Sequence, residues 1–340
     1  EWNIPIVMVG ARSLSSTLFI ALVSLTWQAS HGRSSGSKVF FESRRQSIVS
    51  ETKSVYLHHE SASDLPQMVG RIRFHYDETV SSCQFALLLG VGTFMDVADY
   101  DNLSKAIVYN QNLVVVIMDH NVHNLDKRSS TKFASLANEI IFQINTLIPP
   151  CTRGQAKLMI GGHSAGGQAA MQAWEQGLLS MLPSDVIGFI GLDPYEISDA
   201  TMANNTMMNL SGLYWGFTTT TCLVSVQKAA KAAYDRTMIN GRVLYVIHNK
   251  KSDSQMTHCI FTDKGCGFSP LGCGTTRNTT FNSVYTMVAE SVQLFLQALN
   301  HSRPFSRDTF TLPEYSDEKV DVFVNTDLQN IEDQEAPALL

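Results

Sequence analysis

The sequence predicts an α/β fold in which a mostly parallel sheet carries helices on both faces. From about residue 52 onward, short apolar runs alternate with longer segments of helical periodicity. Of the 340 residues, 44% are hydrophobic and 16% are charged, which is enough apolar material for a large buried core. A glycine-rich segment near residue 164 separates an apolar run from a helical pattern, as a strand-to-helix connection does. These observations together favour repeated strand–helix units and hence parallel strands.

The individual elements follow from the spacing of their apolar residues. Nearly continuous or alternating apolar runs predict strands over 54–58, 70–75, 83–89, 113–118, 157–161, 186–192 and 243–248. Apolar residues at helical spacing predict helices over 101–109, 133–147, 165–179 and 283–299. The pair Pro149-Pro150 ends the second of these helices.

Composition divides the chain into a folded domain and flanking segments. A basic start followed by an apolar stretch, shorter than the about 20 residues that span a bilayer, predicts a signal peptide and no stable transmembrane span. The next segment is rich in serine and basic residues, so we expect a polar linker, with a transit-like segment as the alternative. An irregular region inside the domain predicts a lid-like insertion, and the acidic end of the chain predicts a mobile tail. The boundaries are 1–32 for the N-terminal extension and signal peptide, 33–51 for the linker, 52–303 for the domain, 196–240 for the insertion and 304–340 for the tail.

Charge and cysteine content indicate a secreted or lumenal protein that does not bind nucleic acid. The formal net charge is -6, and the lysines and arginines do not cluster as phosphate binding requires. The six cysteines lack paired C-x-x-C spacing, which favours disulfides over a metal site. Cys259 is expected to pair with Cys266 or Cys273. Glycosylation sequons agree with the secretory route, and they lie at Asn102, Asn204, Asn209, Asn278 and Asn300. Delivery to a plastid after a signal peptide is the alternative destination.

The segment Gly162-His163-Ser164-Ala165-Gly166 matches the motif G-x-S-x-G. The apolar run KLMIG precedes it and the helical pattern AAMQAWEQGLL follows it. This strand–turn–helix context is that of a nucleophile elbow, in which a sharp turn exposes the serine hydroxyl at the edge of the sheet. The motif therefore predicts an α/β-hydrolase fold with Ser164 as a nucleophile.

A serine hydroxyl needs a base, and in this fold an acid and a histidine follow the serine in that order. Asp193 and Asp253 each follow a predicted strand, and spacing alone leaves both open. His258 lies beyond the last predicted strand, where the base is expected. The N–H groups of Ala165 and Thr93 are the predicted oxyanion donors, the second from the loop after the 83–89 strand.

These segments, taken in order, resemble the chlorophyllase family, which is related to the cutinase-like and platelet-activating-factor-acetylhydrolase-like esterases. The resemblance covers roughly residues 80–300. It rests on FALLLGVGTF, LVVVIMD, GGHSAGG, GLDP and the segment around His258 with Phe261 and Cys266. The chain departs from the family pattern at Val91-Gly92, where His-Gly is usual, and at Ala165, where plant chlorophyllases usually carry arginine.

The resemblance implies a triad of Ser164, Asp193 and His258 that cleaves an ester without metal or organic cofactor. It implies chlorophyll as the substrate, with chlorophyllide and phytol as products. Another secreted lipase, esterase or cutinase-like hydrolase is the first alternative, and a catalytically silent binding protein with a hydrolase fold is the second. The partner expected in either enzymatic case is a small ester with an apolar alcohol or acyl group. The sequence leaves the oligomeric state open.

Overall fold

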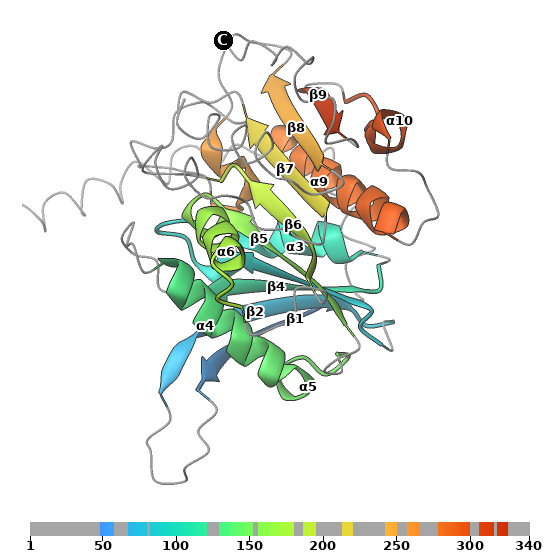
Figure 1. Cartoon of the computed structure of the whole chain (residues 1–340). Coiled ribbons are helices and arrows are strands. Elements are labelled where there is room, and N and C mark those ends of the chain that lie inside the picture. The colour runs from blue at the N-terminus through green and yellow to red at the C-terminus, as the bar shows by residue number, and fades with distance from the viewer. Residues whose placement is uncertain are drawn as a thin grey trace, which may run out of the picture. The chain divides into compact units, whose positions relative to one another are not determined.

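The computed structural model describes most of the chain from residue 48 onward. The described residues are 48–57, 67–79, 82–109, 111–120, 129–151, 156–179, 186–194, 213–219, 242–249, 257–264, 278–299, 306–315 and 318–325. Within them, nine strands form one sheet in the order β1-β2-β4-β3-β5-β6-β7-β8-β9 (Figure 1). The chain thus has a mixed α/β fold with a largely parallel central sheet, which confirms the fold class at this level.

The central strands run parallel and the outer ones antiparallel. The parallel neighbours are β3 (Phe85–Gly90), β4 (Leu113–Asp119), β5 (Lys157–His163), β6 (Val186–Leu192), β7 (Leu213–Thr219) and β8 (Arg242–Asn249). The antiparallel additions are β1 (Ile48–Tyr56), β2 (Met68–Asp77) and β9 (Glu318–Asn325). Every residue of β3 and β4 is buried, which explains their unbroken apolar sequences: both faces of these strands are covered.

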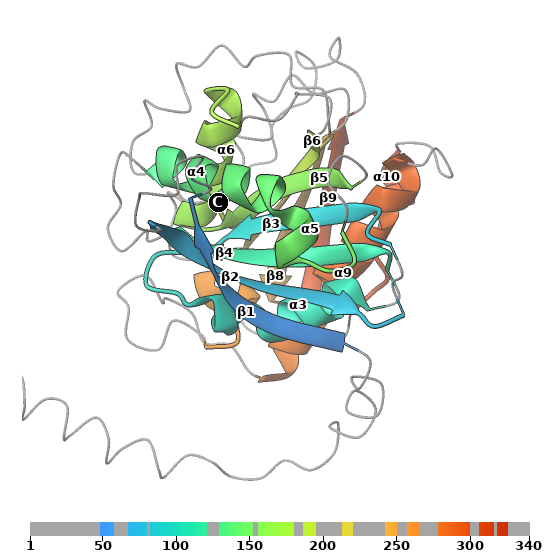
Figure 2. The ribbon, with the colours of Figure 1, turned by 90° about the horizontal axis from the view of Figure 1, so that it is seen from below.

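Helices cover both faces of the sheet (Figure 2). Leu87 and Leu89 of β3 belong to the core that includes α3 (Asp101–Val108) and α9 (Asn278–Leu299). Ala86 and Leu88 point to the opposite core, under α4 (Ser129–Phe142), α5 (Ile144–Leu147) and α6 (Ala165–Glu175). Short helices are η3 (Val97–Tyr100), η4 (His258–Phe261) and α10 (Arg307–Phe310). None of the helices in the described ranges is long and apolar enough to cross a membrane.

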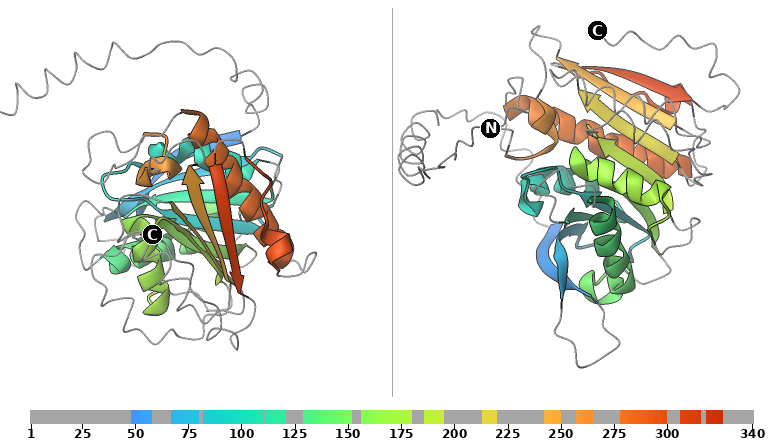
Figure 3. Two further views of the ribbon diagram at one scale, coloured as in Figure 1. Left: turned by 90° about the horizontal axis from the view of Figure 1, so that it is seen from above. Right: turned by 60° about the vertical axis from the view of Figure 1, so that its left-hand side comes forward.

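The structure corrects the prediction of a tail from residue 304. Residues 307–310 form α10, and 318–325 form β9, which pairs with β8 along its whole length (Figure 3). The apolar residues of β9 alternate with the charged residues Lys319 and Asp321, so its composition is polar although Val322 is buried. Composition therefore suggested a tail, whereas period-two alternation is what a strand at the edge of a sheet requires.

Other predicted boundaries also shift. The predicted insertion 196–240 contains β7, which lies between β6 and β8 in the sheet, so residues 213–219 belong to the sheet and not to a lid. The strand β1 begins at Ile48, inside the predicted linker 33–51. The predicted signal peptide and residues 326–340 of the predicted tail lie outside the described residues. Of the sequons, Asn102 lies in α3 with Ser104 fully buried, and Asn278 begins α9.

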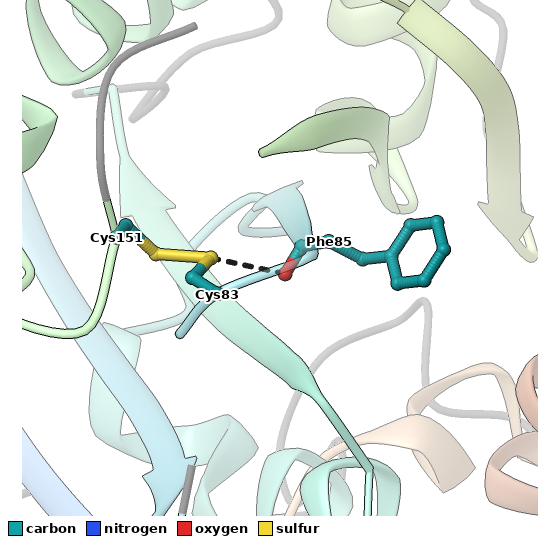
Figure 4. Close-up of a disulfide and its surroundings, with 3 residues drawn as sticks. All are labelled: Cys83, Phe85 and Cys151. Carbon is teal, nitrogen blue, oxygen red and sulfur yellow. Dashed lines mark hydrogen bonds between the residues drawn. A yellow bond between two sulfur atoms is a disulfide. The ribbon is translucent and has the colours of Figure 1, made fainter. Parts of the chain in front are cut away.

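One disulfide joins Cys83 and Cys151 (Figure 4). The two cysteines precede β3 and β5, which are neighbours in the sheet, so the bond links the amino ends of these strands. A backbone hydrogen bond from Cys83 N–H to the Pro150 carbonyl lies beside it, at 2.8 Å. Cys259 is also disulfide-bonded, and its predicted partners, Cys266 and Cys273, lie outside the described residues.

Candidate active site

Ser164 lies in the turn between β5 and α6, as the G-x-S-x-G motif predicts. Its backbone has φ 55° and ψ -125°, a conformation that side-chain-bearing residues rarely adopt. Such a conformation costs about 1–3 kcal/mol and persists only where the surrounding structure enforces it. Two elements hold the turn in place: Ser164 N–H donates to the Leu192 carbonyl of β6, and Gln168 N–H donates to the Ser164 carbonyl.

The glycines that flank Ser164 are required by close backbone contacts. A Cβ on Gly166 would lie 2.2 Å from the Gly90 carbonyl oxygen at the end of β3. A Cβ on Gly162 would lie 2.6 Å from the same oxygen. Both distances are impossible for a methyl group, so α6 can approach the ends of β3 and β5 this closely only because both residues lack side chains. The motif thus specifies the packing of the turn as well as its conformation.

The predicted acid and base meet in the structure although they are far apart in the sequence. His258 Nδ1 lies 3.3 Å from Asp193 Oδ2. Both residues are buried, with Asp193 fully inaccessible. Asp193 directly follows β6 and has φ 44°, which aspartate tolerates better than most residues. The other predicted acid, Asp253, lies outside the described residues.

Local hydrogen bonds hold His258 at the start of η4. Thr257 caps this short helix by accepting a hydrogen bond from Cys259 N–H on its side-chain oxygen. Thr262 Oγ1 donates to the Cys259 carbonyl at the other end. In the described ranges, which include 156–179 and 257–264, no hydrogen bond joins Ser164 to His258. Contacts of this kind are often long in free enzymes and shorten when substrate binds.

The predicted oxyanion donors lie around the elbow. Ala165 is the first residue of α6, so its N–H has no partner within the helix and lies at the positive end of the helix dipole. The loop of residues 91–96, called the oxyanion loop below, carries Thr93. Its Gly92 lies against Ser164, since a Cβ there would be 3.3 Å from the Ser164 Cβ. The loop therefore stands beside the serine, as the prediction for Thr93 requires.

The oxyanion loop contains a third residue with positive φ, Phe94, at φ 65°. Its side chain is 69% exposed, although phenylalanine is normally buried. A hydrogen bond from Met95 N–H to the Gly92 carbonyl closes the turn around it. Arg71 of β2 holds the end of the loop through Asp96 and also binds Asp119 of β4, each at 2.8 Å.

Tyr100, Gly92 and the side chain of His163 also take part in the site, although no sequence motif assigned them a role. Gly92 N–H lies 2.9 Å from Tyr100 Oη, which lies 2.9 Å from His163 Nδ1. His163 Nε2 lies 3.0 Å from the His258 carbonyl oxygen. Burial, with a smaller contribution from His258, lowers the pKa of His163 well below its usual value, so this ring is neutral. No sequence signal pointed to Tyr100, because 63 residues separate it from His163.

The other histidines in the described ranges, His75, His120 and His248, have hydrogen-bond or ion-pair partners outside the candidate site. His248 bridges β8 and β9, with Nε2 3.0 Å from Asp321 Oδ2. His75 and His120 are buried, and burial lowers the pKa of each to about 4. Across the described ranges, no cluster of histidine, cysteine or acidic side chains has the arrangement of a metal site. The candidate site is therefore the region around Ser164, Asp193 and His258.

Comparison with known proteins adds no relative to this picture. No protein-family model matches the chain, and a search of curated proteins finds no significant match.

Proposed function

We propose that this protein is a serine carboxylester hydrolase with an α/β-hydrolase fold. The observation that carries the proposal is the backbone of Ser164, which has φ 55° in a glycine-flanked turn between a parallel strand and a helix. A nucleophile elbow needs this strained conformation to present its hydroxyl, and an ordinary strand–helix connection does not. The strand order and the hydrogen-bonded pair of Asp193 and His258 support the same conclusion.

The proposed reaction follows from the roles of these groups. His258 accepts the proton of Ser164 Oγ as that oxygen attacks the ester carbonyl, and Asp193 orients the imidazole and stabilises its charged form. The N–H groups of Ala165 and Thr93 donate to the oxyanion that forms, and one such donor contributes about 3 kcal/mol in related chemistry. His258 then donates its proton to the leaving alcohol, and water releases the acyl group from Ser164.

Chlorophyll is the proposed substrate, and this part of the proposal depends on the resemblance to chlorophyllases. The exposed ring of Phe94 in the oxyanion loop provides an apolar surface that a long alcohol such as phytol can contact. Conversion of chlorophyll a to chlorophyllide by the purified protein tests the substrate. Hydrolysis of short p-nitrophenyl esters without conversion of chlorophyll would support the alternative of another secreted esterase.

Labelling with a fluorophosphonate probe tests the hydrolase chemistry independently of the substrate. We expect the wild type to be labelled and Ser164→Ala to remain unlabelled. Ser291→Ala is the matched control, because Ser291 is also buried, lies in α9 and donates to the Val288 carbonyl rather than to the site. Absence of labelling in folded wild-type protein would favour the silent binding protein and refute the enzymatic proposal.

A further inference from the structure

Three buried hydrogen bonds connect the parts of the site that must act together. They run from Gly92 of the oxyanion loop through Tyr100 to His163, and from His163 to the backbone of His258. Tyr100 and His163 are 2% and 1% exposed, so water cannot replace these partners. The nucleophile Ser164 directly follows His163 in the chain. This chain of bonds, called the tyrosine–histidine link below, therefore joins the oxyanion loop, the elbow and the base segment.

The chemistry of its ends determines where every proton of the link lies. The His258 carbonyl can only accept, so His163 Nε2 carries a proton and donates it. A neutral His163 then has a lone pair on Nδ1, which accepts from the Tyr100 hydroxyl. Tyr100 Oη has used its single proton, and it accepts from Gly92 N–H through a lone pair. For a neutral His163 ring, each donor has one acceptor and no other arrangement satisfies all three bonds.

The ring of His163 also packs against the base itself. The centroids of the His163 and His258 rings lie 4.7 Å apart, and Phe261 of η4 contacts His163 from another side at 6.0 Å. The ring centroids of Tyr100 and His163 lie 5.9 Å apart, with an angle of 63° between the ring planes. A displacement of His163 would therefore be transmitted to His258 by packing as well as through its carbonyl.

We propose that Tyr100 and His163 are positioning residues that hold the His258 base and the Gly92 backbone in register with Ser164. The inference rests on the proposed hydrolase function. Its physical basis is the steep dependence of catalysis on geometry, since a displacement of about 1 Å can reduce the rate about 100-fold. Neither side chain touches the substrate. The link maintains the distance between the general base and the oxyanion donors while the reaction proceeds.

Steady-state kinetics with a p-nitrophenyl ester test the proposal on the full chain. Tyr100→Phe removes one oxygen atom and should lower kcat about 10- to 100-fold with KM changed less than about twofold. Tyr245→Phe is the matched control, because Tyr245 is equally buried and its hydroxyl donates to the Phe310 carbonyl, which joins β8 to α10. This control should lose stability and keep kcat within about twofold. Equal kcat in the two variants would overturn the proposal.

A second kinetic experiment tests whether His163 acts as a hydrogen-bond donor to the His258 carbonyl. His163→Gln keeps an N–H donor that can reach the His258 carbonyl, whereas His163→Leu has similar volume and no donor. We expect kcat of the glutamine variant to exceed that of the leucine variant about tenfold. Equal kcat in the two would mean that His163 acts through packing alone, which would also contradict the proposal.

Nuclear magnetic resonance of histidine nitrogens separates failure of this inference from failure of the proposed function. Long-range proton–nitrogen spectra of the labelled wild type should include a neutral ring protonated on Nε2 whose signals are absent in His163→Gln. Its Nδ1 signal should shift in Tyr100→Phe and not in Tyr245→Phe. A protonated or Nδ1-protonated His163 would refute the link whether or not the protein hydrolyses esters.

Discussion

The Cys83–Cys151 disulfide should stabilise the fold without contributing to the chemistry. The bond closes a loop with a sequence separation of 68 residues. Loop-closure entropy for a loop of this length predicts that its removal lowers the free energy of unfolding by about 4 kcal/mol. The bond joins the amino ends of β3 and β5, whereas the oxyanion loop and Ser164 follow their carboxyl ends. Stability and activity should therefore separate in the variant that lacks it.

Urea unfolding of Cys83→Ala/Cys151→Ala measures the effect. With a slope of about 3 kcal/mol per M or more for a protein of this size, the midpoint should fall by about 1 M. Reduction with a thiol is not a substitute, because it would also break the disulfide of Cys259, beside His258. The double serine variant is the control, since it removes the same bond with different side chains and should lose a similar amount.

Two results would refute the reasoning. A midpoint within about 0.2 M of the wild type would show that the covalent link does not restrict the unfolded chain as the entropy argument requires. A kcat reduced more than about tenfold in folded variant protein would show that the amino ends of these strands control the site at the opposite ends.

Three further predictions concern the site and the core. Phe94→Gly should raise the midpoint of thermal unfolding, because glycine adopts the positive φ of this position without strain. The same variant should raise KM for long-chain p-nitrophenyl esters more than KM for p-nitrophenyl acetate. Equal changes in KM would exclude an apolar contact between Phe94 and the substrate. Gly166→Ala should give little folded protein, as judged by circular dichroism, because the added Cβ would overlap the Gly90 carbonyl oxygen. A thermal unfolding midpoint equal to that of the wild type would contradict this packing. The free energy of unfolding should fall as pH drops from about 6.5 to about 4. Burial lowers the pKa of His75 and of His120 to about 4 in the folded protein, so both rings stay neutral there, whereas in the unfolded chain they bind protons over this range. His75→Gln should make that decline in urea midpoint shallower, and an unchanged slope would refute the assignment.

The central sheet could be predicted because each of its buried strands has an apolar sequence that is recognisable without its neighbours. Residues 186–192 were predicted as a strand and form β6 with the same bounds, since an unbroken apolar run between polar segments has few other structures. The elbow was also readable, because a local motif determines a local conformation. Chain order left Asp193 and Asp253 both open as the acid partner of Ser164 and His258, and the resemblance favoured Asp193. The structure brings Asp193 and His258 into contact.

What the sequence did not predict depends on contacts between distant segments. The strand β9 has a mixed polar composition and becomes a strand by pairing with β8, some 70 residues earlier in the chain. Tyr100 lies in η3, where its spacing indicates only a helix residue facing the core. Its role depends on simultaneous hydrogen bonds with Gly92 and His163, and no sequence pattern within one segment predicts such contacts. These features are tertiary, so single-sequence reasoning had no access to them.

The position of β9 has a consequence for how the chain folds during synthesis. β8 has one neighbour, β7, until residues 318–325 are made, so the backbone groups on its other side are unpaired during translation. An open edge of this kind can pair with another chain and start aggregation. Because domains emerge from the ribosome amino end first, β9, which covers β8 and replaces it as the edge strand, is the last of the nine strands to be made. A ribosome that stalls before residue 318 would thus hold a nascent protein whose sheet ends at β8, without the charged residues Lys319 and Asp321 that β9 places at this edge.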